Sequence, residues 1–447
     1  MTGRERRPFP NGSLSRRGVV AGVGSSLASS VALAGCLSLP SDDPPPIGVE
    51  KRDLEEIAAI QLPEVNETLP AGVADGHVAA WENRVDSLLE SIPADLATEI
   101  PNEAVRDYIN EEREKARGSL EEATPGRSNF ARLTPMRRAR RYAAEAEGAY
   151  AAAMGGRTRE EVYEDLDTIE RRAGNIASEL TRTGENPRHA LVVYHAIEAR
   201  LRAIRPDHSP ADRQSTLTSE VVAVGESSAW LETRRARVET VEHLLGRQAE
   251  VGETPFDDAF ERAAAELLDE VEDRASEVPP VSADAGELFD APVEGTPREH
   301  VGEELMRDIY GSSNGARDRF ENGWFALSLV SVYALEHELR TLESIRSRIR
   351  DGALERPEGT DEVREAKRTA IAEVQAVREE SAYPHLVQRR LRAAVGAIDR
   401  GDRAVDRGRN DPDPSAVRAL GGYELGAEFA RTLPETTEWL VESLSEA

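Results

Sequence analysis

The sequence predicts an all-α protein, a multi-helix bundle that divides into two related helical subdomains. Long windows of the chain are rich in Ala, Leu, Arg and Glu, which favour helices. Apolar residues recur every three or four positions, and no window shows the alternation expected of a strand. Gly and Pro fall between these windows, where they end one helix and begin the next. Apolar content of 39%, together with 33 glycines in 447 residues, is that of a globular protein.

The first 35 residues have the parts of an export signal in the right order: a charged start, an apolar run and a small-residue end. Arg16 and Arg17 stand directly before the apolar run, a position typical of twin-arginine export. Residues 33–36 read Leu-Ala-Gly-Cys and resemble the lipobox of bacterial and archaeal lipoproteins. That resemblance implies that Cys36, the only cysteine, carries lipid and holds the mature chain on the outer face of the cell membrane. The alternative is that residues 18–35 stay as an uncleaved membrane anchor.

Residues 36–50 are expected to form a tether between the anchor and the folded body. Four prolines and several polar residues crowd this short stretch, a composition that cannot pack into a core and favours an extended chain. Shortly after it, Asn66 begins the sequence Asn-Glu-Thr, a glycosylation sequon. Glycosylation at Asn66 and a chance match to the sequon are both consistent with the sequence.

Residues 51–278 are predicted to form an N-terminal helical domain. Pro187 is expected at the start of one of its helices, because proline suits the first helical turn. Residues 212–246 carry apolar side chains along one interrupted heptad seam, which predicts a long helix packed within a bundle. The further helices expected here lie near residues 81–89, 105–115, 137–154, 162–176, 187–201 and 256–278.

Residues 279–297 contain four prolines and two glycines, and they are predicted to link this domain to a C-terminal helical domain at residues 298–447. Residues 311–315 read Gly-Ser-Ser-Asn-Gly and are expected to be a loop between helices. They lack the Gly-Lys-Ser/Thr ending of a phosphate-binding loop. The helices expected in this domain span residues 301–309, 316–350, 362–380, 384–407 and 415–444, the last as one helix or a pair.

Two segments on either side of this linker align without gaps. Residues 195–204 and 333–342 share the pattern Ala-Ile/Leu-Glu-x-x-Leu-Arg-x-Ile/Leu at an offset of 138 residues. The alignment suggests two related helical units, although helices of similar composition resemble one another without common origin. In both segments a glutamate precedes an arginine by four residues, which predicts solvated ion pairs along the helix: Glu198 with Arg202, and Glu336 with Arg340. The alternative is that the two glutamates are buried acids that face these arginines.

The chain is strongly acidic, with 84 acidic and 56 basic side chains and a formal charge of −28. Without the signal the charge falls to −32, because residues 1–35 hold five arginines and one glutamate. Only three lysines occur, so the cations are almost all arginines. This surface resembles those of proteins from salt-in halophilic archaea, where molar salt screens self-repulsion. The alternative is an ordinary acidic protein from a GC-rich organism. In either case we expect no nucleic-acid binding, which requires Lys and Arg to neutralise phosphates.

Two His-x-x-Glu pairs are candidate metal ligands: His195 with Glu198, and His300 with Glu303. Residues three apart share a helix face, so a bundle could join two such pairs around an ion. The pattern is similar to part of the signature of the imelysin-like family, which are helical, two-repeat exported proteins associated with iron uptake. The resemblance implies a metal-binding surface lipoprotein. The family places glycine two residues before the histidine, where this chain has Val193 and Arg298.

No motif in the sequence identifies a reaction, a cofactor or a serine-hydrolase, zinc-protease or dinucleotide site. Several aromatic residues cluster at helical spacing, which predicts core packing first and, as the alternative, a ligand groove walled by Trp324 and Tyr333. The leading hypothesis is a non-enzymatic, lipid-anchored binding or scaffold module at the cell surface, with a protein partner there. The second hypothesis is the metal-binding protein just described. The members of the aromatic cluster are Tyr310, Phe320, Trp324, Phe325 and Tyr333.

Overall fold

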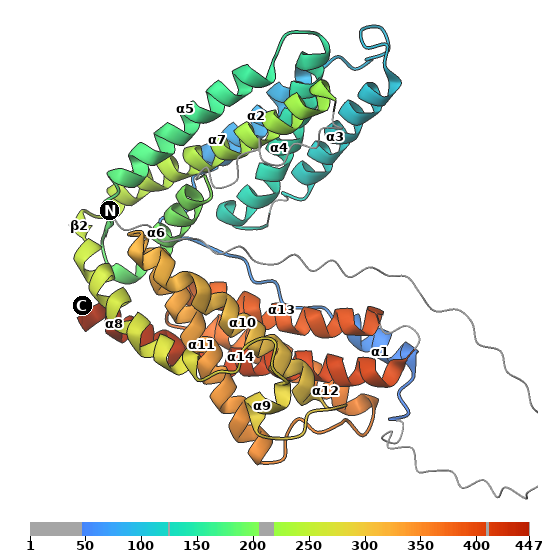
Figure 1. Ribbon diagram of the computed structural model, residues 1–447, viewed down its shortest axis with the longest axis vertical. Coiled ribbons are helices and arrows are strands. Elements are labelled where there is room, and N and C mark those ends of the chain that lie inside the picture. The colour runs from blue at the N-terminus through green and yellow to red at the C-terminus, as the bar shows by residue number, and fades with distance from the viewer. Residues whose placement is uncertain (1–46, 124–125, 205–218, 408–410, 447) are drawn as a thin grey trace, which may run out of the picture. The chain divides into compact units, whose positions relative to one another are not determined.

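The computed structural model describes residues 47–123, 126–204, 219–407 and 411–446, and these form an all-α bundle (Figure 1). The export signal, with Arg16, Arg17 and Cys36, lies outside the described residues. Helices α1 to α14 follow one another along the chain. The described residues include one sheet, in which β1 (Thr183–Gly184) pairs antiparallel with β2 (Thr254–Pro255). The predicted fold class is therefore confirmed.

The first part of the bundle is built around the antiparallel neighbours α4 and α7. Helix α4 also packs against α2 and α3, and α7 against α5 and α6. Close approach of α4 and α7 depends on glycine: a Cβ at Gly225 would lie 2.8 Å from the carbonyl oxygen of Glu145. The helices of this part are α2 (Asp75–Glu90), α3 (Glu103–Glu121), α4 (Asn129–Ala153), α5 (Arg159–Ser178), α6 (Pro187–Arg202) and α7 (Glu220–Val251). Helix α1 (Lys51–Ala58) precedes them in the chain but packs against the second part of the bundle.

The second part of the bundle is organised by the long helix α14, which packs against α10, α11, α12 and α13. Glycines again bring two helices together, because a Cβ at Gly422 would lie 2.8 Å from the backbone nitrogen of Gly401 on α13. Most of the residues of helix α11 are buried, and α11 packs against α8, α10, α14 and α6. The elements are α8 (Asp257–Ser276), α9 (Ala285–Phe289), α10 (Pro297–Glu321), α11 (Phe325–Arg350), α12 (Thr360–Glu380), α13 (Pro384–Arg407) and α14 (Pro412–Glu446).

Lys367, one of the three lysines, links helix α1 to the second part of the bundle. The fully buried Lys367 ammonium donates hydrogen bonds to the carbonyl oxygens of Ile57 (3.0 Å) and Ala58 (2.9 Å), at the C-terminus of α1. It also contacts the carboxylate of Asp402 at 2.8 Å, and the Tyr423 hydroxyl donates to that same carboxylate. Lys367 thus satisfies carbonyl groups that a helix end otherwise leaves without partners.

The predicted loop at residues 311–315 is wrong. Helix α10 continues through this Gly- and Ser-rich stretch to Glu321, and the predicted helix at residues 316–350 is divided at residues 322–324 instead. There Gly323 has a φ of 75°, the left-handed conformation that glycine adopts readily, and the Trp324 amide bonds back to the Arg319 carbonyl at 2.8 Å. Packing of α10 along α11 outweighs the low helix propensity of the two glycines.

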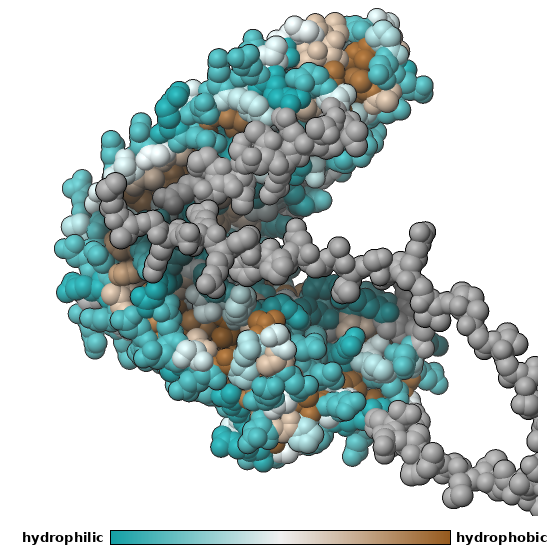
Figure 2. Space-filling view, viewed as in Figure 1, coloured by the Kyte–Doolittle hydropathy of each residue, from teal (hydrophilic) through white to brown (hydrophobic). Residues whose placement is uncertain are grey.

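The face of the protein shown in Figure 2 is mostly hydrophilic where its residues are described. Four large apolar side chains among the described residues are exposed: Met154, Val251, Val281 and Tyr310. Among these same parts of the chain, no helix has both the length and the apolar composition needed to cross a bilayer.

Candidate functional site

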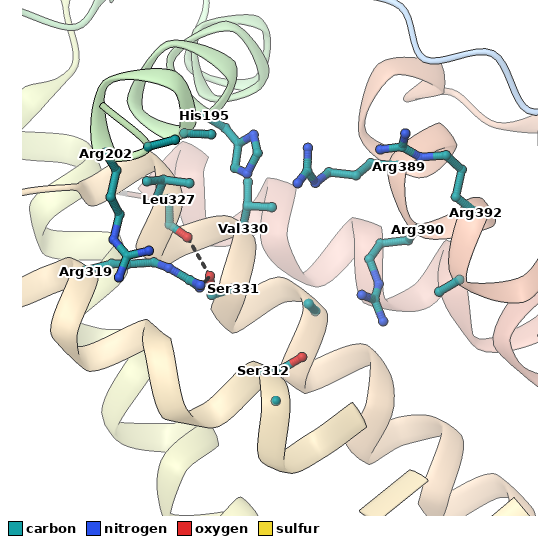
Figure 3. Close-up of a pocket in the computed structure, with 15 residues that line it drawn as sticks. His195, Arg202, Ser312, Arg319, Leu327, Val330, Ser331, Arg389, Arg390 and Arg392 are labelled. Carbon is teal, nitrogen blue, oxygen red and sulfur yellow. Dashed lines mark hydrogen bonds between the residues drawn. The ribbon is translucent and has the colours of Figure 1, made fainter. Parts of the chain in front are cut away.

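The candidate site begins with a cavity of about 610 Å³ between four helices, α6, α10, α11 and α13 (Figure 3). Five arginines line it, three of them from a single turn of α13. In Figure 3 the Arg389 side chain extends toward His195, while Arg202 and Arg319 lie together on the other side of the cavity. The five are Arg202, Arg319, Arg389, Arg390 and Arg392.

Small residues lie between the large cationic side chains and leave the space that forms the cavity. Helix α6 contributes Ala199 and Ala203, and α10 contributes Gly311 and Ser312 from the stretch predicted to be a loop. Helix α6 is itself fixed by its local sequence: Asn186 caps its first turn by accepting a hydrogen bond from the His189 amide at 3.0 Å, and proline follows in the first turn. The apolar face of α6 is buried, whereas Ala199 and Ala203 line the cavity.

A second cavity of about 720 Å³ adjoins the first. Four residues line both: His195, Ala199, Arg389 and Arg392. The second cavity extends along α4 and is also lined by the segment at residues 64–67, which precedes α2. We call the two cavities together the arginine groove.

The charge of the arginine groove is opposite to that of the chain as a whole. Its lining contains nine arginines and two glutamates, although the full sequence has 84 acidic and 56 basic side chains. A lining with the composition of the whole chain would instead hold about three acidic side chains for every two basic ones. The lining arginines are Arg127, Arg137, Arg138, Arg200, Arg202, Arg319, Arg389, Arg390 and Arg392, and the glutamates are Glu64 and Glu67.

Burial and mutual repulsion destabilise the positive charges in the groove. Burial is the largest cause, and together with the neighbouring arginines it lowers the pKa of Arg200 and of Arg389 to about 10, although Glu67 opposes the shift. The pKa of Arg319 is also lowered, by burial and by the nearby Arg202. With pKa values of about 10, Arg200 and Arg389 stay cationic at neutral pH. An anion placed in the groove would offset the repulsion between these positive charges.

Several of these arginines have only neutral partners. Arg200 donates to the Ala196 carbonyl oxygen at 2.7 Å and lies over the Phe130 ring, 4.8 Å from its centre. Arg319 donates to the Ser331 hydroxyl. Within the described ranges, no carboxylate lies within ion-pair distance of Arg200, Arg319 or Arg137 on α4.

Glu67 shows which kind of group the groove accepts. Its carboxylate lies 3.3 Å from the Arg389 guanidinium and 3.0 Å from that of Arg392. Two guanidinium groups on neighbouring positions of α13 therefore hold one oxyanion between them. Arginine suits this task because its planar donors match the oxygens of a carboxylate or phosphate.

His195, predicted as a metal ligand, lies in the arginine groove. It is 6% exposed, and it lines both cavities. Burial holds its pKa well below the usual value, and the surrounding arginines lower it further. The imidazole is therefore neutral at neutral pH and can accept or donate a hydrogen bond there.

Glu198 does not share the surroundings of His195. It is fully buried and pairs with Arg182, whose Nε donates to its Oε1 at 2.6 Å. The Leu327 amide at the start of α11 donates to Oε2 at 2.8 Å. The predicted ion pair between Glu198 and Arg202 is wrong, because Arg202 instead lies 3.3 Å from Asp318.

The equivalent pair in the other aligned segment does form. Arg340 Nε donates to the Glu336 carboxylate at 2.6 Å, as predicted from their spacing. The predicted solvation is wrong, since Glu336 is 1% exposed and also binds Arg274. Both aligned glutamates are thus buried acids with arginine partners.

His300 and Glu303 lie in another cavity, of about 660 Å³, between α10, α13 and α14. The structure does not bring them to His195 and Glu198, which have different neighbours. Within the described residues, no three His, Cys, Asp or Glu side chains form a group that could hold a metal ion. The four predicted ligands therefore do not make one metal site in this part of the chain.

The remaining predicted positions are placed as follows. Asn66 lines the second cavity beside Glu67, and the Thr68 hydroxyl of its sequon donates to Gln388 Oε1 at 2.8 Å. Tyr333 is a core residue, 1% exposed, with its hydroxyl 2.7 Å from that of Thr437. Trp324 is 5% exposed and borders a separate cavity. The two do not form the walls of one groove, so the core interpretation holds for both.

Sequence reasoning missed the arginines of the groove, although two short runs pointed to them. Residues 137–141 contain four arginines and residues 389–392 contain three, in a chain whose surface is otherwise acidic. The first run lies on α4 and the second on α13. Only the fold shows that both runs face the same part of α6.

Comparison with known families divides the chain into two matched segments, and both contribute residues to the arginine groove. Residues 76–254 match a family model described as a domain of unknown function (DUF8262), and residues 257–442 match another described in the same way (DUF8264). No curated protein and no solved structure matches the chain significantly. Helices α4 and α6 belong to the first matched segment, and α10, α11 and α13 to the second. The groove is thus assembled from both.

Proposed function

We propose that this protein is an extracytoplasmic binding module that captures an anionic ligand in the arginine groove. One observation carries the proposal: nine arginines and two glutamates line adjoining cavities in a chain with a net charge of −28. Gathering like charges is unfavourable unless something offsets their repulsion, and a bound anion does so. The Glu67 carboxylate, held between Arg389 and Arg392, supports an oxyanion as the ligand group.

Pyrophosphate is a suitable probe, because it offers several anionic oxygen acceptors in a small volume. We expect it to bind the wild-type chain in titration calorimetry, and Arg389→Gln to weaken binding about 10- to 100-fold, since a hydrogen bond to a charged group contributes about 1.5–3 kcal/mol. Arg171→Gln is the matched control, because Arg171 lies exposed on α5 and lines none of these cavities. Equal affinities for wild type and Arg389→Gln would place pyrophosphate outside the groove.

The second part of the proposal concerns location. The twin-arginine sequence, the Leu-Ala-Gly-Cys motif and the proline-rich tether support a folded body attached to the cell membrane through lipid on Cys36. In a cell fractionation experiment, Cys36→Ser is expected to move the protein from the membrane fraction to the medium or to leave it unprocessed. A Cys36→Ser chain that is processed and membrane-bound as before would contradict lipid attachment.

A further inference from the structure

We propose that the ligand is one linear polyanion that occupies both cavities of the arginine groove, carrying several oxyanion groups along its length and no aromatic bases. This inference rests on the proposed function, which requires only that an anion binds somewhere in the groove. It adds the length, the charge spacing and the chemical class of the ligand.

The first support is continuity between the two cavities. They share four lining residues, so a ligand that occupies both cavities lies against these residues. Ala199 stands at this junction and offers only a methyl group. Arg389 and Arg392 reach it from α13, and they supply charge at the point where the two cavities join.

The second support is that each cavity also has arginines of its own. Within the described residues, a small anion in the second cavity would leave Arg319 without a counter-charge, and one in the first would leave Arg137 and Arg200 without one, whereas a chain through both would serve all three. Arg202, Arg319 and Arg390 line the first cavity alone, and Arg127, Arg137, Arg138 and Arg200 line the second alone.

The third support is the near absence of surfaces on which bases could stack. In the described lining, Phe130 is the single Phe, Tyr or Trp, and the Arg200 guanidinium lies over its ring at 4.8 Å. Proteins that bind single-stranded nucleic acid combine a basic groove with free aromatic faces. The arginine groove has the first feature and lacks the second, which favours a chain of oxyanions such as a linear polyphosphate.

The test compares the affinities of phosphate, pyrophosphate, tripolyphosphate and a longer linear polyphosphate for the full chain, at equal concentrations of phosphate groups. We expect affinity to rise about tenfold or more from pyrophosphate to the long chain, because a ligand held in one cavity binds the second at high effective concentration. One long chain should bind per protein. Equal affinity at every length, or two long chains per protein, would overturn the inference.

Three variants locate the long ligand. Arg319→Gln changes the first cavity alone and Arg137→Gln the second alone, and each is expected to weaken the long chain. Ala199→Trp fills the junction without removing charge, and it should reduce the affinity of the long chain to about that of pyrophosphate while pyrophosphate itself still binds. A long chain unaffected by Ala199→Trp, in a variant with unchanged melting temperature, would show that the ligand does not cross the junction.

The outcomes separate this inference from the proposed function. Binding of pyrophosphate without any effect of length would leave the anion-binding function intact and overturn the polyanion. Failure of every phosphate probe to bind would contradict both. An oligothymidylate that binds more tightly than a polyphosphate of equal charge would identify nucleic acid as the ligand class, and would overturn the inference in favour of that alternative.

Discussion

Replacing Glu198 with alanine is expected to lower the free energy of unfolding by about 3–5 kcal/mol, the usual effect of removing one partner from a buried ion pair. The Glu198 carboxylate is fully buried and accepts hydrogen bonds from the Arg182 guanidinium and from the Leu327 amide. Without it, Arg182 keeps Asp257 at 2.7 Å and the Gly323 carbonyl, but its Nε loses a charged partner in the interior. Urea unfolding followed by circular dichroism measures the change.

The size of this effect also follows from where Glu198 lies. It joins α6, in the first matched segment, to the N-terminus of α11, in the second. A carboxylate there satisfies amides that a helix start leaves free, and it interacts favourably with the helix dipole. Glu303→Ala is the matched control, because Glu303 is an exposed glutamate on α10, and we expect a change within about 0.5 kcal/mol. A similar small change for Glu198→Ala would contradict this account of the junction.

The ends of a helix could be predicted well wherever a periodic pattern of apolar residues was bounded by proline or glycine. The helices at α12 and α13 agree with the expected ranges within two residues, and Pro187 begins α6 as expected. The stretch at residues 311–315 could not be predicted, because its two glycines resemble a loop and the packing that keeps it helical comes from α11, a later part of the chain. Local propensity decides a segment only where tertiary contacts are weak.

The candidate site was harder to predict than the helices. Its arginines come from distant parts of the sequence, and an average over the whole chain shows only the acidic excess. His195 was identified from the sequence as a functional candidate, and it does line the groove, but its predicted partner Glu198 points to other neighbours. A spacing of three residues places two side chains near one face of a helix. Helix α6, however, packs against several other helices, so two neighbouring positions on one face can contact different helices.

Replacing two arginines of the groove together is expected to have the largest effect on ligand binding. Arg319 and Arg389 come from α10 and α13, and both line the first cavity. Removing two charge-assisted contacts of about 1.5–3 kcal/mol each should weaken an oxyanion about 10²- to 10⁴-fold, which amounts to loss of measurable binding. Circular dichroism of the double variant Arg319→Gln/Arg389→Gln would establish that it folds.

The central claim is that an oxyanion binds in the arginine groove, and the most direct test is to locate one by anomalous X-ray scattering. Crystals of the protein would be grown with tungstate, whose heavy atom marks its own position. We predict a tungsten peak with its oxygens about 3 Å from the guanidinium nitrogens of Arg319 or Arg389, and no such peak in crystals of the double variant. Tungsten only elsewhere on the surface, or an unchanged peak in the double variant, would contradict the claim.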